Sequence, residues 1–164
     1  MENKINPEQL KEAMRTWITG VAIVTGQHNG DIHGMTANSF NSLALTPPTV
    51  LVALQNHSRT QKLVQEGGFF GVTILSNDQI ELARRFAGQI DQDQPRFEGV
   101  DIFTLVSGVP LIAGGLAYLD CQVKSAYNVG ATTMFIGEVL ASQTGESPHE
   151  PLLYFNRRWR KLAQ

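Results

Sequence analysis

The chain has 164 residues, which is enough to bury one hydrophobic core and too short for two full domains. Thirteen Lys and Arg residues against fifteen Asp and Glu residues give a formal net charge of −2. No general positive field attracts a nucleic acid or an anionic membrane, so we expect neither as a partner. A single cysteine excludes an intrachain disulfide framework, and the polar N-terminal segment lacks the apolar run of a signal peptide, so we expect a cytoplasmic protein.

The N-terminal segment predicts one short helix. Asn6 followed by Pro7 is typical of a capped helix start, and Leu10 and Met14 give an amphipathic stretch that ends before Thr19. Trp17, near the end of this helix, is expected to pack in the core.

A β pattern follows the helix. The segments VAIVTG and HGMTANSF flank the Asn29-Gly30 pair, which is a strong signal for a hairpin turn. Pro47 and Pro48 separate SLALT from TVLVALQ, because proline does not fit inside a central strand. The second of these runs is rich in Val and Leu and predicts a strand that is buried on both faces.

Two short helices with the same start signal come next. The spacings Ser58 to Gln61 and Ser76 to Gln79 each fit a capping box, and the segment FFGVTIL between them predicts a strand. The second helix places Phe86 and other apolar residues on one face, as a surface helix over a core does.

The last third reads as a loop followed by strands. Residues 89–108 lack a sustained period and predict a long surface loop. Around Cys121, apolar residues alternate with polar neighbours such as Asp120, which predicts a strand with one wet face; TTMFIGEVLAS is its partner, and PLLYF a short strand. The chain is therefore mainly β, and we predict a closed or split antiparallel barrel with peripheral helices.

The sequence contains few groups for acid–base or nucleophilic chemistry. It has no GxSxG or HExxH motif, no convincing carboxylate pair and no His and Cys spacing that suits a metal. Cys121 is expected to be an inert core residue. An enzyme of this composition would need a cofactor to supply its reactivity.

Two segments are candidates for binding such a cofactor. Ser58, Arg59 and Thr60 combine hydroxyls, a guanidinium and the free amides of a helix start, which suits a phosphate; the alternative is an ordinary helix cap with a solvated arginine. The small and polar residues at 36–39 suit the edge of a flat polar ring; the alternative is an exposed strand end or bulge.

The basic end of the chain is a third, weaker candidate. Arg157, Arg158, Arg160 and Lys161 surround Trp159. The run is typical of a solvated tail or a subunit contact, and contact with cofactor phosphates is the alternative.

Several motifs, in order, resemble the flavin reductase family with the FMN-binding split barrel, which includes the reductase components of two-component flavin monooxygenases. The resemblance extends from about Leu10 to Trp159. It is carried by GMTANSFNSLALTPPTVLVALQNHSRTQKL, LARRFAG, PLIAGGLAYLDCQV, MFIGEV and PLLYFNRRW. It implies a single domain over 1–164, a homodimer of antiparallel split β-barrels, binding of FMN or FAD, reduction by NADH or NADPH, and a partner monooxygenase.

The resemblance also assigns roles to residues. It puts 36–39 along the isoalloxazine edge and the hydroxyls near residue 58 at the flavin phosphate, with the RRFAG helix completing that end. The cofactor-binding residues it implies are Thr36, Ala37, Asn38, Ser39, Gln55, Ser58, Thr60, Arg85 and Phe86.

One position departs from the family pattern. Thr132 stands where related reductases commonly carry a histidine that helps place the nicotinamide. We therefore predict an NAD(P)H-dependent flavin reductase with Thr132 as its nicotinamide candidate. The alternative is an FMN-binding electron-transfer or sensor protein that NAD(P)H does not reduce directly.

Overall fold

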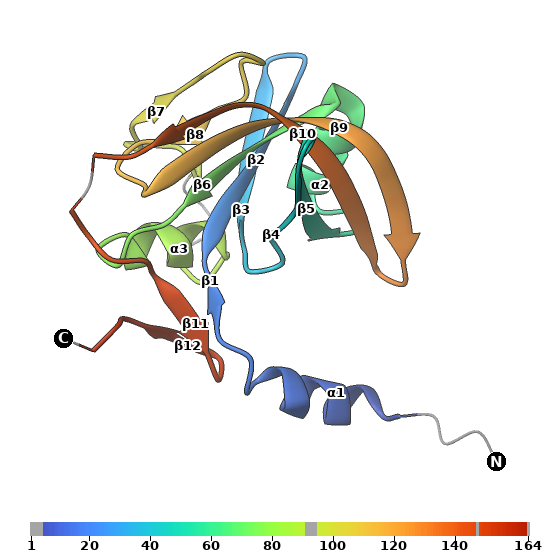
Figure 1. Ribbon diagram of the computed structural model, residues 1–164, viewed down its shortest axis with the longest axis vertical. Coiled ribbons are helices and arrows are strands. Elements are labelled where there is room, and N and C mark those ends of the chain that lie inside the picture. The colour runs from blue at the N-terminus through green and yellow to red at the C-terminus, as the bar shows by residue number, and fades with distance from the viewer. Residues whose placement is uncertain (1–4, 91–94, 147, 164) are drawn as a thin grey trace.

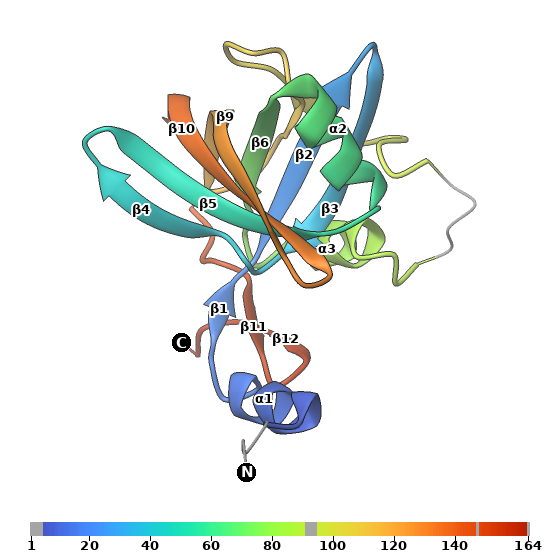
Figure 2. The ribbon, with the colours of Figure 1, turned by 90° about the vertical axis from the view of Figure 1, so that its right-hand side faces the viewer.

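The computed structural model describes residues 5–90, 95–146 and 148–163. Its centre is a strongly curved, antiparallel sheet of seven strands in the order β3-β2-β6-β9-β10-β5-β4 (Figures 1 and 2). The members of this sheet are β2 (Ala22–His28), β3 (Asp31–Ala37), β4 (Asn41–Leu45), β5 (Pro48–Gln55), β6 (Phe69–Ile74), β9 (Ala117–Val129) and β10 (Thr132–Thr144). This is the mainly β, antiparallel architecture that the sequence predicted.

Smaller elements surround the large sheet. A second sheet has the order β1-β11-β12, and β7 pairs with β8. The helices α2 and α3 lie beside β2 and β3 (Figure 2). The bounds are α1 (Pro7–Met14), β1 (Thr19–Gly20), α2 (Arg59–Gly67), α3 (Ile80–Phe86), β7 (Ile102–Phe103), β8 (Leu111–Ile112), β11 (Leu153–Phe155) and β12 (Arg158–Arg160).

The predicted hairpin between β2 and β3 is confirmed. Asn29 and Gly30 both have positive φ, at 50° and 81°, as the tightest hairpin turns require. The pairing runs from His28 opposite Asp31 to Ala22 opposite Ala37. Strand β3 lies at the edge of the large sheet, and this pairing with β2 fixes its register.

Strand β5 is buried on one face rather than on both. Val50, Val52 and Leu54 are buried, whereas the residues between them are only half-buried. The prediction of two buried faces was wrong because apolar residues also fill the outer face of this strand. The buried side chains join Phe70 and Phe135 in the core inside the curved sheet.

Each predicted capping box is only half formed. The Ser58 hydroxyl accepts the Gln61 amide at 3.2 Å, but the Gln61 side chain turns to Gln65 instead of returning to the cap. At the second site, the Gln79 side chain accepts the Ser76 amide at 3.1 Å, and α3 begins one residue after Gln79 without a side-chain cap. A capping motif can thus fold with either of its hydrogen bonds alone.

The predicted wet face of β9 is wrong at Asp120. This carboxylate is fully buried and accepts the amides of Val106 and Ser107 at 2.8 and 2.7 Å. The segment after β7 supplies both amides, so hydrogen bonds tie this part of the predicted surface loop to the sheet. Of its residues, 91–94 lie outside the described part of the chain.

The N-terminal helix forms an arm that leaves the body of the molecule. Asn6 caps α1 as predicted, but no residue of α1 is buried, and the helix projects away from the large sheet (Figure 1). Trp17 is 67% exposed, so its predicted place in the core is wrong. Leu10 and Met14 are exposed as well, and among the described residues neither core cluster includes any part of α1.

The basic end of the chain is more structured than a solvated tail. Strand β12 pairs with β11, and the rings of Tyr154 and Trp159 contact each other with centroids 5.1 Å apart.

Across the described ranges, we find no helix with the length and apolar character needed to cross a membrane.

Candidate functional site

A hollow of about 620 Å³ opens where β3, β5 and the two helices α2 and α3 come together. We call it the β3 hollow. A volume of this size is typical of a site for a small molecule or cofactor. Eight of the predicted site residues line it together: Thr36, Ala37, Asn38, Ser39, Gln55, Ser58, Thr60 and Phe86.

Two predicted residues do not line this hollow. The Arg85 guanidinium donates to the carbonyl of Glu98 at 2.8 Å, which directs it along the segment after α3. Thr132 begins β10 and lies opposite Gln55 in the register of the sheet. Gln55 does line the hollow, so Thr132 lies next to one of its lining residues.

Two hydroxyls at the end of β3 fix the shape of the hollow. Thr36 donates to the carbonyl of Ala83 in α3 at 2.6 Å, and Ser39 donates to the carbonyl of Ala53 in β5 at 2.6 Å. Their hydrogens are used inside the protein. The donors left for a ring edge are the exposed amide of Asn38 and the outer backbone edge of β3, an edge strand.

Two arginines make one end of the β3 hollow cationic. Arg59 forms an ion pair with Asp31, and this hydrogen-bonded guanidinium lowers the pKa of the Asp31 carboxyl. Arg96 donates to the carbonyls of Gly34 and Phe86 at 2.8 and 2.9 Å, and burial lowers the pKa of its guanidinium. The described lining of the hollow includes no carboxylate, so this end suits an anion.

A histidine lies beside the same cationic end. The His33 Nδ1 atom is 2.9 Å from the Thr60 hydroxyl oxygen. Burial, followed by the charges of Arg96 and Arg59, lowers the pKa of His33 from 6.5 to about 4. The ring is therefore neutral at physiological pH.

Sequence reasoning missed His33 and Arg96, and it left Arg59 open between a phosphate site and a solvated side chain. Period-two alternation could have found His33, because it lies on the same strand face as Met35 and Ala37, which also line the hollow. No local signal points to Arg96, which reaches the site across the fold.

Gly34 allows the wall of the hollow to pack closely. A Cβ atom at this position would lie 3.0 Å from Cε1 of Phe86 and 3.2 Å from Cγ2 of Thr25. Phe86 is fully buried and makes an edge-to-face contact with Phe97 at 5.1 Å. The absence of a side chain at Gly34 thus sets the position of the Phe86 ring.

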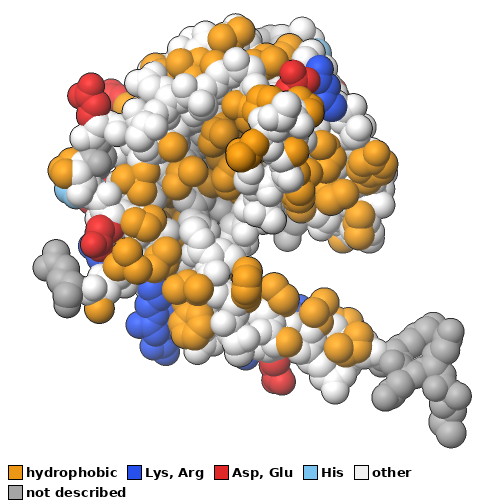
Figure 3. All heavy atoms as spheres, viewed as in Figure 1, with side chains coloured by type: hydrophobic (Ala, Val, Ile, Leu, Met, Phe, Trp, Pro, Cys, Tyr) orange, Lys and Arg blue, Asp and Glu red, His pale blue; other side chains and the backbone are white. Residues whose placement is uncertain are grey.

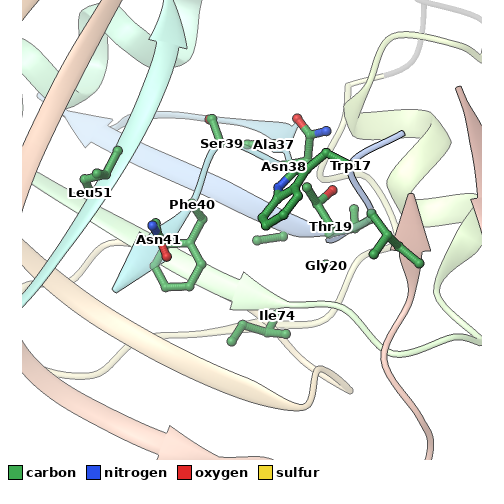
Figure 4. A pocket seen from close by; sticks show the side chains of 13 residues that line it. Trp17, Thr19, Gly20, Ala37, Asn38, Ser39, Phe40, Asn41, Leu51 and Ile74 are labelled. Atoms are coloured by element: carbon green, nitrogen blue, oxygen red, sulfur yellow. The ribbon is translucent and has the colours of Figure 1, made fainter. Parts of the chain in front are cut away.

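A second hollow, of about 510 Å³, lies on the arm side of the same strand end. Figure 4 shows the Trp17 indole beside Asn38 and Thr19, with the Phe40 ring on the body of the molecule. We call this the arm hollow. Because Asn38 borders both hollows, a flat ring held along residues 37–39 could be reached from two sides.

Comparison with known proteins identifies the family. Residues 14–163 match the model described as "Flavin reductase like domain". The chain belongs to this family. The resemblance predicted from the sequence motifs is confirmed. Within this flavin reductase-like domain, the β3 hollow combines small strand residues with a cationic helix start.

Named relatives agree with this assignment. The chain is 35% identical over 151 residues to a protein named NADH-dependent flavin reductase StyB from Pseudomonas fluorescens, covering 91% of this chain and 86% of that one. It is 36% identical over 162 residues to a protein named NADH-dependent FAD reductase from Streptomyces globisporus, covering 94% and 85%.

Solved structures share the fold. Flavin reductase PheA2 in its native state superposes with a TM-score of 0.88 at 36% identity, covering 98% of this chain and 100% of that one. The Streptomyces globisporus C-1027 NADH:FAD oxidoreductase SgcE6, in complex with NAD and FAD fragments, gives 0.86 at 33% identity, covering 98% and 97%.

The reactive side chains of this flavin reductase-like chain are few. Cys121 is fully buried, and burial raises the pKa of its thiol to about 12, with a further contribution from Asp120. No group of three or more His, Cys, Asp or Glu side chains is placed to hold a metal ion in the described ranges. The predicted inert core role of Cys121 agrees with its burial.

Proposed function

We propose that the protein is an NADH-dependent flavin reductase, in which a hydride passes from the nicotinamide to FMN or FAD. The β3 hollow carries this proposal, because it joins a small-residue strand end to a cationic helix start in a chain of the flavin reductase-like family. NADH is favoured over NADPH by the names of the relatives. We further propose that the reduced flavin serves a separate monooxygenase, since several relatives are named as reductase subunits of such systems.

Within this proposal the whole chain, 1–164, acts as one flavin-binding domain in the cytoplasm, where NADH is available. The isoalloxazine edge lies along residues 36–39, and the phosphate lies at the start of α2. The side chains proposed to hold the flavin are Thr36, Ala37, Asn38, Ser39, Gln55, Ser58, Thr60, Arg85 and Phe86, with Thr132 on the nicotinamide side.

The bound flavin supplies the redox chemistry, and the chain supplies binding and orientation. Donors along β3 favour negative charge at the ring edge, and the wall formed by Phe86 excludes water from one side. Asn38, which lines both hollows, would hold the ring edge between them and leave one side of the ring to the nicotinamide. No side-chain acid or base is required.

We also propose that two chains form a homodimer. The arm exposes Leu10, Met14, Trp17 and Ile18, and hydrophobic side chains continue along it in Figure 3. An apolar surface of this kind needs cover in water. A second copy would provide it and would close the arm hollow beside Asn38. Light scattering should give twice the chain mass, and the variant W17K should shift the mass toward that of one chain.

The proposed activity is tested by steady-state oxidation of NADH and of NADPH in the presence of FMN, FAD or riboflavin, with an electron acceptor. We expect turnover with NADH and at least one flavin. The variant T132V should raise the KM for NADH more than it lowers kcat, while its exposed neighbour in the hairpin turn, changed as A131S, should match the wild type. Absence of turnover with every pair of donor and flavin would overturn the proposal.

A flavin-binding electron carrier or sensor is the alternative outcome. Such a protein would retain FMN and accept electrons from dithionite, but not from NADH or NADPH. That result would keep the β3 hollow as the flavin site and remove the reductase activity.

A further inference from the structure

His33 has no part in the predicted site, yet it touches a residue proposed to hold the flavin phosphate. Its Nδ1 atom is 2.9 Å from Thr60 Oγ1, and this contact joins β3 to the first turn of α2. Thr60 is fully buried, so its hydroxyl has few other partners. The direction of this one hydrogen bond therefore decides what the hydroxyl can offer to a ligand.

A threonine hydroxyl has one hydrogen to donate. If Thr60 donates it to His33, only lone pairs face the β3 hollow, and lone pairs repel a phosphate. If His33 carries the hydrogen on Nδ1, the ring donates to Thr60 Oγ1 and leaves the hydroxyl hydrogen for the anion. Only the second arrangement fits a phosphate at this end of the hollow.

The surroundings of the ring leave both arrangements open until an anion is bound. Arg59 of α2, Arg96 from the segment after α3 and Asp31 of β3 are the charged groups that act on His33. Burial, and after it the two arginines, which outweigh the carboxylate, keep the imidazole neutral, so that either ring nitrogen can carry its single hydrogen. A phosphate at Thr60 then selects the form with hydrogen on Nδ1.

We propose that His33 is a positioning residue for the flavin phosphate: it donates from Nδ1 to Thr60 Oγ1 and so turns the Thr60 hydroxyl hydrogen toward the phosphate. His33 thereby increases the preference of the site for phosphorylated flavins over riboflavin. This inference rests on the proposed function, because it needs the flavin phosphate at the start of α2.

The test compares binding of FMN and riboflavin, which differ in the phosphate, by fluorescence titration. In H33A, Thr60 loses the donor that orients its hydroxyl, and FMN binding should weaken about threefold to tenfold, the usual effect of losing a hydrogen bond between neutral groups. Riboflavin binding should stay within about twofold of the wild type. H33N keeps an N–H near the Nδ1 position and should retain most of the FMN affinity.

Two further variants separate positioning from folding. T60V removes the hydroxyl, and the double variant H33A/T60V should lose no more FMN affinity than T60V alone, because both changes remove the same hydrogen bond. H28A is the matched histidine control: His28 lies at the far end of β2 with its ring near Asn29, and we expect no change in either affinity.

Three results would overturn the inference: equal weakening of FMN and riboflavin by H33A, a loss in H33N as large as that in H33A, or additive losses in the double variant. Turnover of NADH with flavin in the wild type would still support the proposed function in these cases. Failure of the wild type to bind any flavin would instead overturn the proposed function, and this inference with it.

Discussion

Replacing Gly34 by alanine tests how the wall of the β3 hollow is built. The added Cβ would lie 3.0 and 3.1 Å from two carbons of the Phe86 ring and 3.2 Å from a Thr25 methyl carbon. Carbon atoms pack best at about 3.5–4.0 Å, so the ring must move by a few tenths of an ångström. Overpacking of this kind costs about 1–3 kcal/mol.

Urea unfolding of G34A should show this loss in the free energy of unfolding. The control is G20A, because a Cβ at Gly20 meets no atom within 4 Å; we expect it to range from no change to a gain of about 1 kcal/mol. The double variant G34A/F86L should be less destabilised than the sum of its parts, because the smaller side chain relieves the contact.

The same change should reach the flavin. Phe86 lines the β3 hollow, so a displaced ring changes the shape of the hollow, and a loss of about 1 kcal/mol in binding raises the Kd about fivefold. If G34A is as stable as G20A and binds FMN as the wild type does, then the close approach at Gly34 does not shape the site.

Three further predictions follow from the charges and burial. His33 binds a proton near pH 6.5 when unfolded but only near pH 4 when folded. A fall in pH across this window should therefore lower the free energy of unfolding by about 1–2 kcal/mol, after allowance for the partial exposure of the ring. Urea titrations of H33N at several pH values should lack this part of the pH dependence. R59A should raise the Kd for FMN about fivefold to tenfold with unchanged riboflavin binding. Since exposed ion pairs contribute little, the free energy of unfolding of R59A should stay within about 1 kcal/mol of the wild type. The control R84A removes another exposed ion-paired arginine and should change neither flavin binding nor stability; equal effects of the two variants would contradict the cationic end of the hollow. Cys121 should resist a thiol reagent at about pH 8 until urea unfolds the chain, because burial holds its pKa near 12; rapid labelling of the native protein would contradict its burial.

Local sequence signals predicted much of the fold. The Asn29-Gly30 turn and the Asn6 cap depend on neighbouring residues alone, and both form as expected. Asp120 shows where such reasoning ends. Its alternation with apolar neighbours indicated a wet face, but a distant segment supplies two amides that make its burial favourable.

A limit of local reasoning also explains why the prediction for Trp17 was wrong. Its size and apolar character favour a core, but none of the described residues of the helix before it is buried, and the Trp17 side chain is exposed. The local pattern of a sequence thus does not show whether an apolar side chain will be covered.

The candidate site divides in a similar way. The strand end at residues 36–39 and the helix start at Ser58 were predicted because small residues and capping residues leave a signal in the sequence. Arg96 left none, since its role depends on reaching the carbonyls of Gly34 and Phe86 across the fold. Arg85 was predicted from its position within a motif, and its guanidinium donates to the carbonyl of Glu98.

Anaerobic titration of the flavin-loaded protein with NADH tests the central claim most directly. We expect the absorbance of the oxidised flavin to disappear at about one equivalent of NADH, because a hydride carries both electrons that the flavin accepts. Persistence of the oxidised spectrum after excess NADH and NADPH, in a sample that dithionite bleaches at once, would contradict the reductase function.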